Sequence, residues 1–206
     1  TRVALDHADI VLTEAGFGSD LGAEKFLDIK ARHGGLDVAG VVVVATIRSL
    51  KYNGGMARTD LTTESLDHLR EGVKNLARHV ANIQQFGATP IVALNLFTSD
   101  TEAEREFMRA WARDYHVALE ECEVWARGGA GAEKLAQVVL DNLSKGSSPL
   151  YDPRRGVEAS IEALARRIYR ADKVEYAPKA LKDLAVLREN GWDELPVCIS
   201  KTQYSF

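Results

Sequence analysis

The sequence of 206 residues has few of the features that define specialised classes of protein. Two cysteines are too few for a disulfide framework, and no uncharged apolar run approaches the ~18 residues of a transmembrane helix. A net charge of −4 argues against a dedicated nucleic-acid-binding protein, which normally presents a basic face. The hydrophobic content of 46% is too high for a disordered chain. These absences leave an ordinary soluble chain, long enough for one good core or two small ones.

Common catalytic and metal-binding motifs are also missing from the sequence. There is no Gly-x-Ser-x-Gly elbow, no HExxH or CxxC pair, and no GxxxxGKS or GxxxxGKT loop to hold phosphates. His68 and His79 lie eleven residues apart on one predicted helix, about 16 Å along its axis, which is too far to share a metal ion. We therefore predict no metal site, and we expect Cys122 and Cys198 to be reduced core residues, as in a cytoplasmic protein.

The two ends of the sequence do not resemble the ends of a complete protein. It begins at Thr1 instead of methionine, without the charged start, apolar run and small-residue cleavage site of a signal peptide. It stops at Phe206 without a turn, a cap or a polar tail. We therefore interpret the chain as an internal segment of a longer protein.

Short β-branched segments alternate with helical segments along the chain. Strands are predicted at residues 9–13, 40–46, 89–94, 116–124 and 196–200. Helices are predicted along an apolar stripe from Leu66 to Ile83, from Asp100 or Thr101 onward, and at 131–143, 158–169 and 178–189. Apolar runs such as 41–44 are typical of parallel strands buried on both faces. The alternation predicts an α/β fold with a mostly parallel sheet flanked by helices.

A change in composition divides the sequence near residue 150. Residues 145–156 (KGSSPLYDPRRG) are rich in Gly, Ser and Pro, which is typical of a linker. We predict an α/β segment over 1–146 that carries the ligand-facing loops, and a linker at 147–156. A small helical segment over 157–206, ending in a strand, completes the predicted organisation.

Ligands of parallel α/β sheets bind at the carboxyl ends of the strands, so the residues after each strand are candidates for a site. After the first strand, the glycine-rich loop at 14–22 fits either an anion at a helix N-terminus or a tight turn. After the second strand, Arg48 and Lys51 precede Asn-Gly-Gly and could hold phosphate or carboxylate, or simply lie in solvent.

The loops after the last two predicted central strands carry aromatic residues. Asn95 and Asp100 fit recognition of a nucleotide base as in P-loop GTPases, although Asp100 also suits a helix N-cap. Phe97 in this polar loop is either a core residue or a platform for stacking. Trp125 lies beside a glycine-rich turn at 128–131. It could stack against a planar ligand that carries a phosphate or carboxylate, or it could be a structural tryptophan, and the sequence favours neither interpretation.

Five blocks of the sequence, in family order, resemble the formate–tetrahydrofolate ligase family, also called formyltetrahydrofolate synthetase. These blocks are residues 13–26 (TEAGFGSDLGAEKF), 44–55 (VATIRSLKYNGG), 95–102 (NLFTSDTE), 123–131 (EVWARGGAG) and 196–206 (PVCISKTQYSF). The family usually has alanine where this chain has Ser49, and commonly has proline where it has Thr98. The resemblance extends over essentially all 206 residues.

The resemblance implies an ATP-dependent C–N ligase of one-carbon metabolism. Such an enzyme converts ATP, formate and tetrahydrofolate to 10-formyltetrahydrofolate, ADP and phosphate through formyl phosphate. Its partners are these small molecules, with Mg²⁺ and, as an open point, a monovalent cation; neither nucleic acid nor membrane is expected to bind. The resemblance also implies a P-loop NTPase-like core, here lacking its phosphate loop, and a cytoplasmic homo-oligomer, since the family forms tetramers.

The resemblance carries roles to individual residues. Phe97 and Trp125 match the aromatic residues that sandwich the planar folate, and Phe17 matches an aromatic residue close to the formyl phosphate. The glycine-rich turn is expected near the nucleotide through Gly128, Gly129 and Gly131. Four further side chains are predicted to bind nucleotide or anion from charge and position alone: Arg48, Lys51, Asn95 and Asp100. No residue is assigned as catalytic.

The missing phosphate loop limits the function that this sequence supports by itself. Because members of the family carry such a loop, we expect the 206-residue chain alone to be inactive or severely impaired. Two other classes stay open: a noncatalytic folate- or nucleotide-binding module derived from the family, and a switch-type NTPase related through the P-loop fold.

Overall fold

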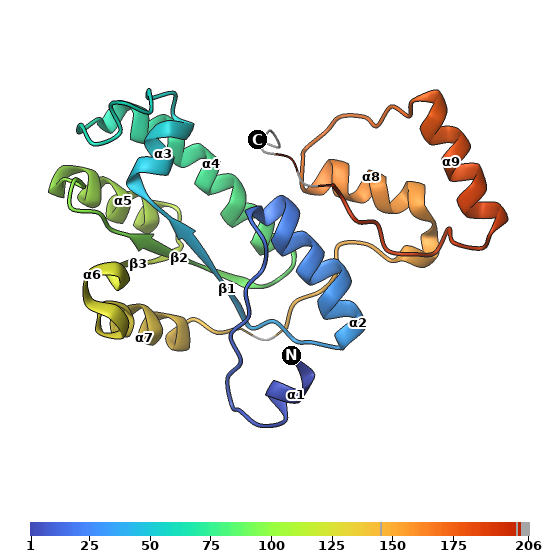
Figure 1. Cartoon of the computed structure of the whole chain (residues 1–206), viewed down its shortest axis with the longest axis horizontal. Helices are drawn as coiled ribbons and strands as arrows, with labels where there is room; N and C mark the ends of the chain where they lie inside the picture. The colour runs from blue at the N-terminus through green and yellow to red at the C-terminus, as the bar shows by residue number, and fades with distance from the viewer. Residues whose placement is uncertain (145, 201, 203–206) are drawn as a thin grey trace. The chain divides into compact units, whose positions relative to one another are not determined.

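The computed structural model describes residues 1–144, 146–200 and 202, which form two compact units (Figure 1). Unit 1 comprises Thr1–Val38, Gln85–Gly87 and Gly146–Phe206, and unit 2 comprises Ala39–Gln84 and Ala88–Lys145. Among the described residues, no helix is both long enough and apolar enough to cross a membrane. The closing block of the family resemblance lies partly outside the described residues, at Lys201 and 203–206.

Unit 2 contains a three-stranded parallel sheet of β1 (Gly40–Ala45), β2 (Thr89–Asn95) and β3 (Ala118–Cys122), in that order. Val43 pairs in register with Val92 of the central strand, and Asn95 pairs with Cys122 of the third. Five successive residues of β2 are buried, as expected for the centre of a parallel sheet. The structure confirms the predicted α/β fold with a parallel sheet flanked by helices.

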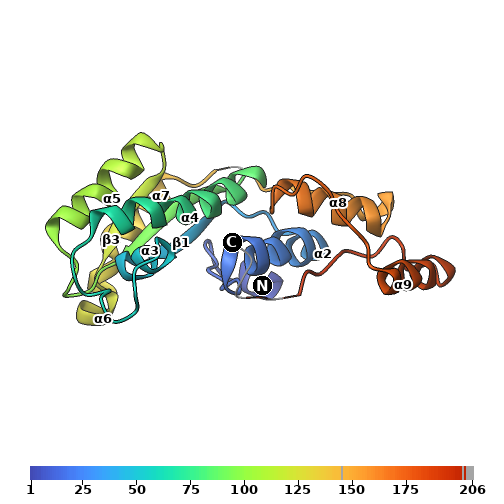
Figure 2. The same ribbon diagram turned by 90° about the horizontal axis from the view of Figure 1, so that it is seen from above.

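Helices connect the strands of unit 2, as parallel pairing requires. They are α3 (Ile47–Asn53), α4 (Leu66–Gln85), α5 (Glu102–Asp114), α6 (Val124–Arg127), the short η3 (Gly128–Ala132) and α7 (Glu133–Asp141). The apolar stripe of α4 is buried as predicted, and it packs with β2 and α5 in one core. The ribbon of α4 lies beside the sheet in both views (Figures 1 and 2). Members of this core include Leu69, Val73, Leu76, Val80, Val92, Leu94 and Met108.

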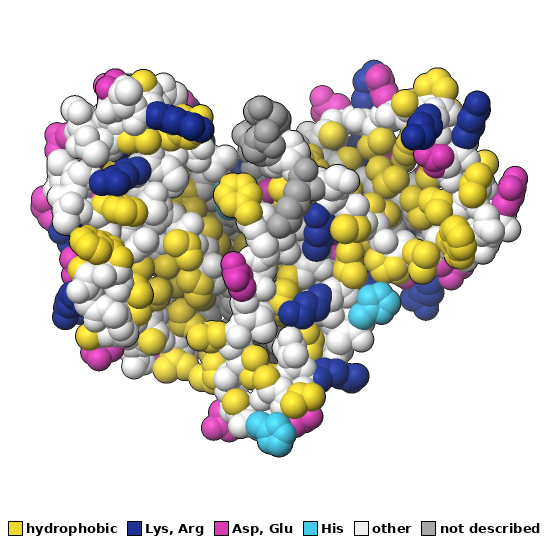
Figure 3. Space-filling view, in the orientation of Figure 1, with side chains coloured by type: hydrophobic (Ala, Val, Ile, Leu, Met, Phe, Trp, Pro, Cys, Tyr) yellow, Lys and Arg dark blue, Asp and Glu magenta, His cyan; other side chains and the backbone are white. Residues whose placement is uncertain are grey.

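One face of β1 departs from the prediction that the apolar strands are covered on both sides. Val42 and Val44 are 40% and 69% exposed. They alternate with Val43, which packs against the core, so they belong to the opposite face of the sheet. Helix α7 on that side packs against β3 and β2 instead. Figure 3 shows hydrophobic side chains gathered over this part of unit 2.

Unit 1 is built from helices and wide helical turns joined by extended segments. Its elements are α1 (Arg2–Leu5), η1 (Gly18–Ala23), η2 (Phe26–Ala31), α2 (Arg32–Gly34), η4 (Pro153–Arg155), α8 (Val157–Arg167) and α9 (Pro178–Glu189). Helix α9 has the predicted bounds and begins at a proline. The core of unit 1 contains Leu27, Phe86, Leu164, Ile168 and residues 150–151. An ion pair between Arg188 and Glu158 joins α9 to α8.

Two predicted strands, at 9–13 and 196–200, are not strands in the structure. Ile10 and Leu12 are 54% and 84% exposed, so their apolar alternation follows no buried face. The N–H of Val197 donates to the hydroxyl of Tyr151 at 3.0 Å, and its carbonyl accepts from the same hydroxyl at 3.3 Å. A side chain therefore satisfies the backbone groups that a neighbouring strand would otherwise bind.

Candidate functional site

The loop between β2 and α5 is closed by hydrogen bonds at both ends. Asp100 accepts the backbone N–H of Phe97 at 2.8 Å through Oδ2, and the N–H of Asp100 donates to the Phe97 carbonyl at 3.0 Å. Burial raises the pKa of Asp100, and the bond from Phe97 opposes this shift. Thr101, not Asp100, caps α5, in a reciprocal capping box with Glu104. Asp100 therefore fixes the backbone of Phe97.

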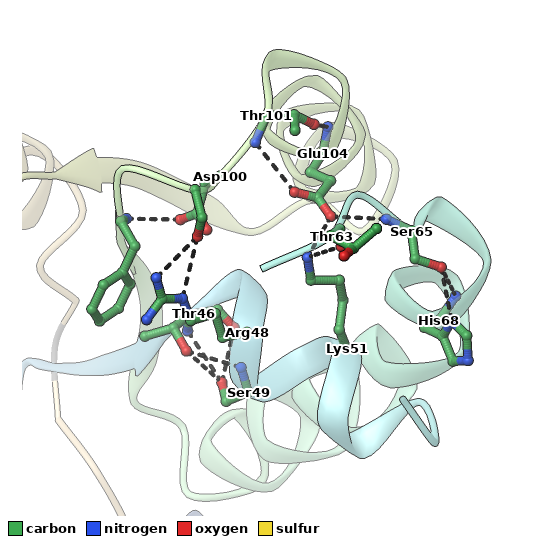
Figure 4. Close-up of polar contacts among 12 residues, drawn as sticks. Thr46, Arg48, Ser49, Lys51, Thr63, Ser65, His68, Asp100, Thr101 and Glu104 are labelled. Carbon is green, nitrogen blue, oxygen red and sulfur yellow. Dashed lines mark hydrogen bonds and ion pairs between the residues drawn. The ribbon is translucent and has the colours of Figure 1, made fainter. Parts of the chain in front are cut away.

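The ring of Phe97 is half-buried and stacks on the side chain of Arg48. The guanidinium carbon of Arg48 lies 4.3 Å from the ring centroid, within the range of a cation–π contact. Ser99 accepts from Nη2 and Nε of Arg48 at 3.0 and 3.3 Å. Arg48 lies in the first turn of α3, which Thr46 and Ser49 cap (Figure 4). The predicted anion-binding arginine is thus held against the aromatic ring.

Trp125 is anchored at the end of the neighbouring strand by its indole nitrogen. Nε1 donates to the carbonyl of Leu96, the residue before Phe97, at 3.2 Å. The rest of the side chain is 64% exposed. Because a hydrogen bond at its edge fixes the indole, its apolar ring is held in place without being covered. The Trp125 side chain is therefore tied to the backbone position next to Phe97.

The glycine-rich turn that follows Trp125 is partly required by close packing. A Cβ on Gly131 would lie 2.5 Å from the carbonyl oxygen of Glu123, so a larger residue does not fit there. The N–H of Glu123 donates to the Gly131 carbonyl at 3.1 Å and closes the turn. Gly128 has a φ of 56°, which favours glycine, and a Cβ on Gly128 or Gly129 would meet no atom within 4 Å.

Lys51 does not present its ammonium group to solvent. Its Nζ is 2.7 Å from Oε1 of Glu104 and donates to the carbonyl of Thr63 at 2.8 Å (Figure 4). Both side chains are almost completely buried, at 1% and 0% exposure. Glu104 also accepts the N–H groups of Ser65 and Thr101, at 3.1 and 3.2 Å. The ion pair therefore joins α3 and α5 to the segment between α3 and α4.

Phe17 belongs to unit 1, whereas Phe97 and Trp125 belong to unit 2. Its side chain is 79% exposed, and Phe17 is the residue immediately before η1. The Phe17 carbonyl accepts the N–H of Gly22 at 3.1 Å. A Cβ on Gly22 would lie 1.7 Å from the carbonyl oxygen of Gly16, so the backbone of this loop folds back on itself too closely for any other residue.

Ser99 and Glu104 are the two site residues that sequence reasoning missed. Glu104 carried one local signal, because it stands three residues after Thr101 in a capping-box spacing. Its pairing with Lys51 spans 53 positions and has no local signature.

The two cysteines differ from each other in burial. Cys122 is buried as predicted, but Cys198 is exposed, so the prediction that it is a core residue is wrong.

The parallel sheet of unit 2 therefore carries Phe97 in the loop after β2 and Trp125 in the helix after β3, at the strand ends where ligands of α/β proteins usually bind. Comparison with known sequences identifies the family. A family model described as formate–tetrahydrofolate ligase matches residues 1–206. This chain therefore belongs to the formate–tetrahydrofolate ligase family, which confirms the resemblance seen in its sequence blocks.

Several curated relatives, each named formate–tetrahydrofolate ligase, match the whole chain. A relative from Corynebacterium diphtheriae is 59% identical over 207 residues, which cover 100% of this chain and 38% of the relative. Those from Corynebacterium jeikeium and Staphylococcus aureus are 55% and 51% identical, with 36% and 38% of their lengths covered. The chain thus spans little more than a third of the length of these relatives.

Proposed function

We propose that this chain carries the tetrahydrofolate-stacking part of a formate–tetrahydrofolate ligase. The proposed reaction joins formate to tetrahydrofolate at the expense of ATP, through formyl phosphate, and releases 10-formyltetrahydrofolate, ADP and phosphate. The observation that carries the proposal is that the Trp125 indole is bonded to the residue next to Phe97, whose own backbone is held in place. Trp125 bonds to the Leu96 carbonyl at 3.2 Å, and Asp100 holds the Phe97 amide at 2.8 Å.

The chemistry of the reaction suits a site made of fixed aromatic rings. Formate is a poor acyl donor because hydroxide is a poor leaving group, and phosphorylation makes a mixed anhydride that an amine nitrogen can attack. The protein must then hold the folate amine close to the anhydride, and such orientation by itself contributes a large part of the acceleration. Phe97 and Trp125 would fix the plane of the folate ring in this way.

The other predicted site residues receive different proposals. Phe17 stays a proposed neighbour of the formyl phosphate, and Gly128, Gly129 and Gly131 stay proposed neighbours of the nucleotide, both through the family resemblance. Because Lys51 and Asp100 bind partners inside the fold, we propose positioning roles for them instead of anion binding. Asn95, at the last position of β2, stays a proposed nucleotide contact.

Mg²⁺ is proposed as the ion that accompanies ATP. In the part of the chain that the structure describes, no group of three or more His, Cys, Asp or Glu is arranged to hold a metal ion. Mg²⁺ usually needs only one or two carboxylates besides the phosphates of its substrate, and we assign no ligand to it here. A monovalent cation, a homotetrameric assembly and a cytoplasmic location also stay predictions from the family.

Binding of tetrahydrofolate to the chain tests the proposal directly. We expect isothermal titration calorimetry to detect saturable binding that Phe97→Ala or Trp125→Leu weakens by at least ~5-fold, since stacking on one aromatic ring contributes about 1–3 kcal/mol. Trp192→Leu is the matched control, because Trp192 is 51% exposed but lies in unit 1. Binding that is absent, or that tolerates both site substitutions, would contradict the proposal.

ATP-dependent formation of 10-formyltetrahydrofolate is the second test. Because the sequence lacks a phosphate loop, we expect the 206-residue chain to bind the folate but to form little or no product. Robust turnover by this chain would show that its phosphate site is built from other residues.

A further inference from the structure

The guanidinium of Arg48 packs against one face of the Phe97 ring, and this contact restrains both side chains. It is centred 4.3 Å from the ring, and two of its nitrogens contact the hydroxyl of Ser99 at 3.0 and 3.3 Å. Arg48 comes from α3, whereas Phe97 and Ser99 come from the loop after β2 (Figure 4). The contact therefore joins a helix to a loop that the backbone bonds of Asp100 already close.

We propose that Arg48 is a positioning residue that sets the Phe97 ring from behind and does not bind an anion. This inference rests on the proposed function, because it names how the folate-stacking ring is held. It also replaces the role that charge and position alone suggest for an arginine at the end of a strand.

Three features of the structure support a positioning role over direct ligand contact. An aromatic ring has two faces, and the guanidinium occupies one of them, so a flat ligand would stack on the other. Ser99 fixes the in-plane direction of the guanidinium through two of its nitrogens, as a planar fork permits and a lysine does not. The backbone of Phe97 is held by Asp100 at 2.8 Å, so the ring is restrained at its base and on its rear face.

The energetic consequence is preorganisation of the ring. A phenylalanine ring that must be ordered when a ligand binds lowers the affinity, because its rotamer freedom is lost at that step. A ring already held by a cation–π contact avoids this loss. Removing Arg48 should therefore weaken every ligand that stacks on Phe97, whatever the charge on the rest of that ligand.

The test compares two ligands that share a ring system but differ in charge. Tetrahydrofolate carries the glutamate carboxylates, and 6-methyltetrahydropterin carries only the ring. We expect Arg48→Met to weaken both by the same factor, between about 3- and 30-fold. Arg48→Lys and Ser99→Ala should give smaller losses, again equal for the two ligands.

Arg58→Met is the matched control for a lost stacked arginine. Arg58 stacks on Tyr52 at 5.1 Å in the same unit, and its Nη2 donates to the Tyr52 hydroxyl at 3.4 Å. We expect this variant to bind both ligands like the unsubstituted chain. Equal weakening by Arg58→Met and Arg48→Met would overturn the proposal, because any stacked arginine would then have the same effect.

A spectroscopic measurement tests the stacking without a ligand. The Hε proton of Arg48 should be shifted upfield by the ring current of Phe97, and Phe97→Leu should abolish that shift. Its absence in the unsubstituted chain would overturn the proposed geometry.

The outcomes separate this proposal from the proposed function. If Arg48→Met weakens tetrahydrofolate but not the pterin, Arg48 contacts the carboxylates and the positioning role is wrong. If Phe97→Ala weakens binding and Arg48→Met does not, the positioning role fails while the folate site stands. If the unsubstituted chain binds neither ligand, both proposals fail.

Discussion

Replacing Lys51 with methionine, Glu104 with leucine, and both together measures what the buried ion pair contributes to unit 2. The pair is 2.7 Å long and almost fully buried. Lys51→Met would leave the Glu104 carboxylate with two backbone N–H donors, from Ser65 and Thr101. Glu104→Leu would leave the ammonium with one hydrogen-bond acceptor among the described residues, the Thr63 carbonyl. The charge that keeps fewer partners costs more to bury, so we expect Glu104→Leu to be the more destabilising change.

The expected magnitudes follow from the burial of both partners. Removing one partner of a buried pair costs about 3–5 kcal/mol, because the other charge is left without compensation. Replacing both by apolar groups of similar size is often close to neutral. We therefore expect each single variant to lose at least ~3 kcal/mol of unfolding free energy, and the double variant to lose less than Glu104→Leu alone.

Urea unfolding followed by Trp111 fluorescence reports on this change. Trp111 lies on α5 with Glu104, and replacing Trp125 and Trp192 with phenylalanine leaves it as the single reporter of unit 2. Asp67→Ala is the control, because its ion pair with Arg70 is exposed and should contribute less than about 1 kcal/mol. Additive losses in the double variant, or single losses below 1 kcal/mol, would refute the reasoning.

Two further predictions concern unit 1. Burial, followed by the negative charge of Asp28, raises the pKa of Glu24 from 4.5 to about 8. The folded state therefore holds a proton that the unfolded state releases, so stability should fall by up to ~1.4 kcal/mol per pH unit between pH 4.5 and 8. Glu24→Gln should remove this fall, and thermal midpoints measured across that range check it; equal slopes would contradict it. Gly22→Ala should cost more than about 3 kcal/mol, because its Cβ would lie 1.7 Å from the Gly16 carbonyl, whereas Gly129→Ala should unfold like the original chain.

The elements of unit 2 were predictable because their signals are local. The β-branched run of β1 and the three-and-four spacing along α4 each indicate one kind of element. The strand predicted at 196–200 failed because strand formation needs a neighbour, and Val197 instead bonds to the side chain of Tyr151, 46 positions away. Likewise, no local pattern indicates that residues 1–38 pack with those after 146 in unit 1.

The candidate site shows the same division between local and distant signals. The positions of Phe97 and Trp125 followed from the rule that ligands meet the carboxyl ends of parallel strands. The contacts that the basic residues make within the fold could not be predicted, because a cation after a strand has the same local sequence whether it faces a ligand or another side chain. Contacts of Lys51 with Glu104 and of Arg48 with Ser99 span 53 and 51 positions.

Fluorescence of Trp125 during titration with tetrahydrofolate tests the central claim most directly. Replacing Trp111 and Trp192 with phenylalanine leaves Trp125 as the single tryptophan of the chain. A folate ring stacked on the indole should quench this emission saturably, and Phe97→Ala should shift the titration to higher concentrations. A linear decrease without saturation, or a curve that Phe97→Ala leaves unchanged, would contradict the account.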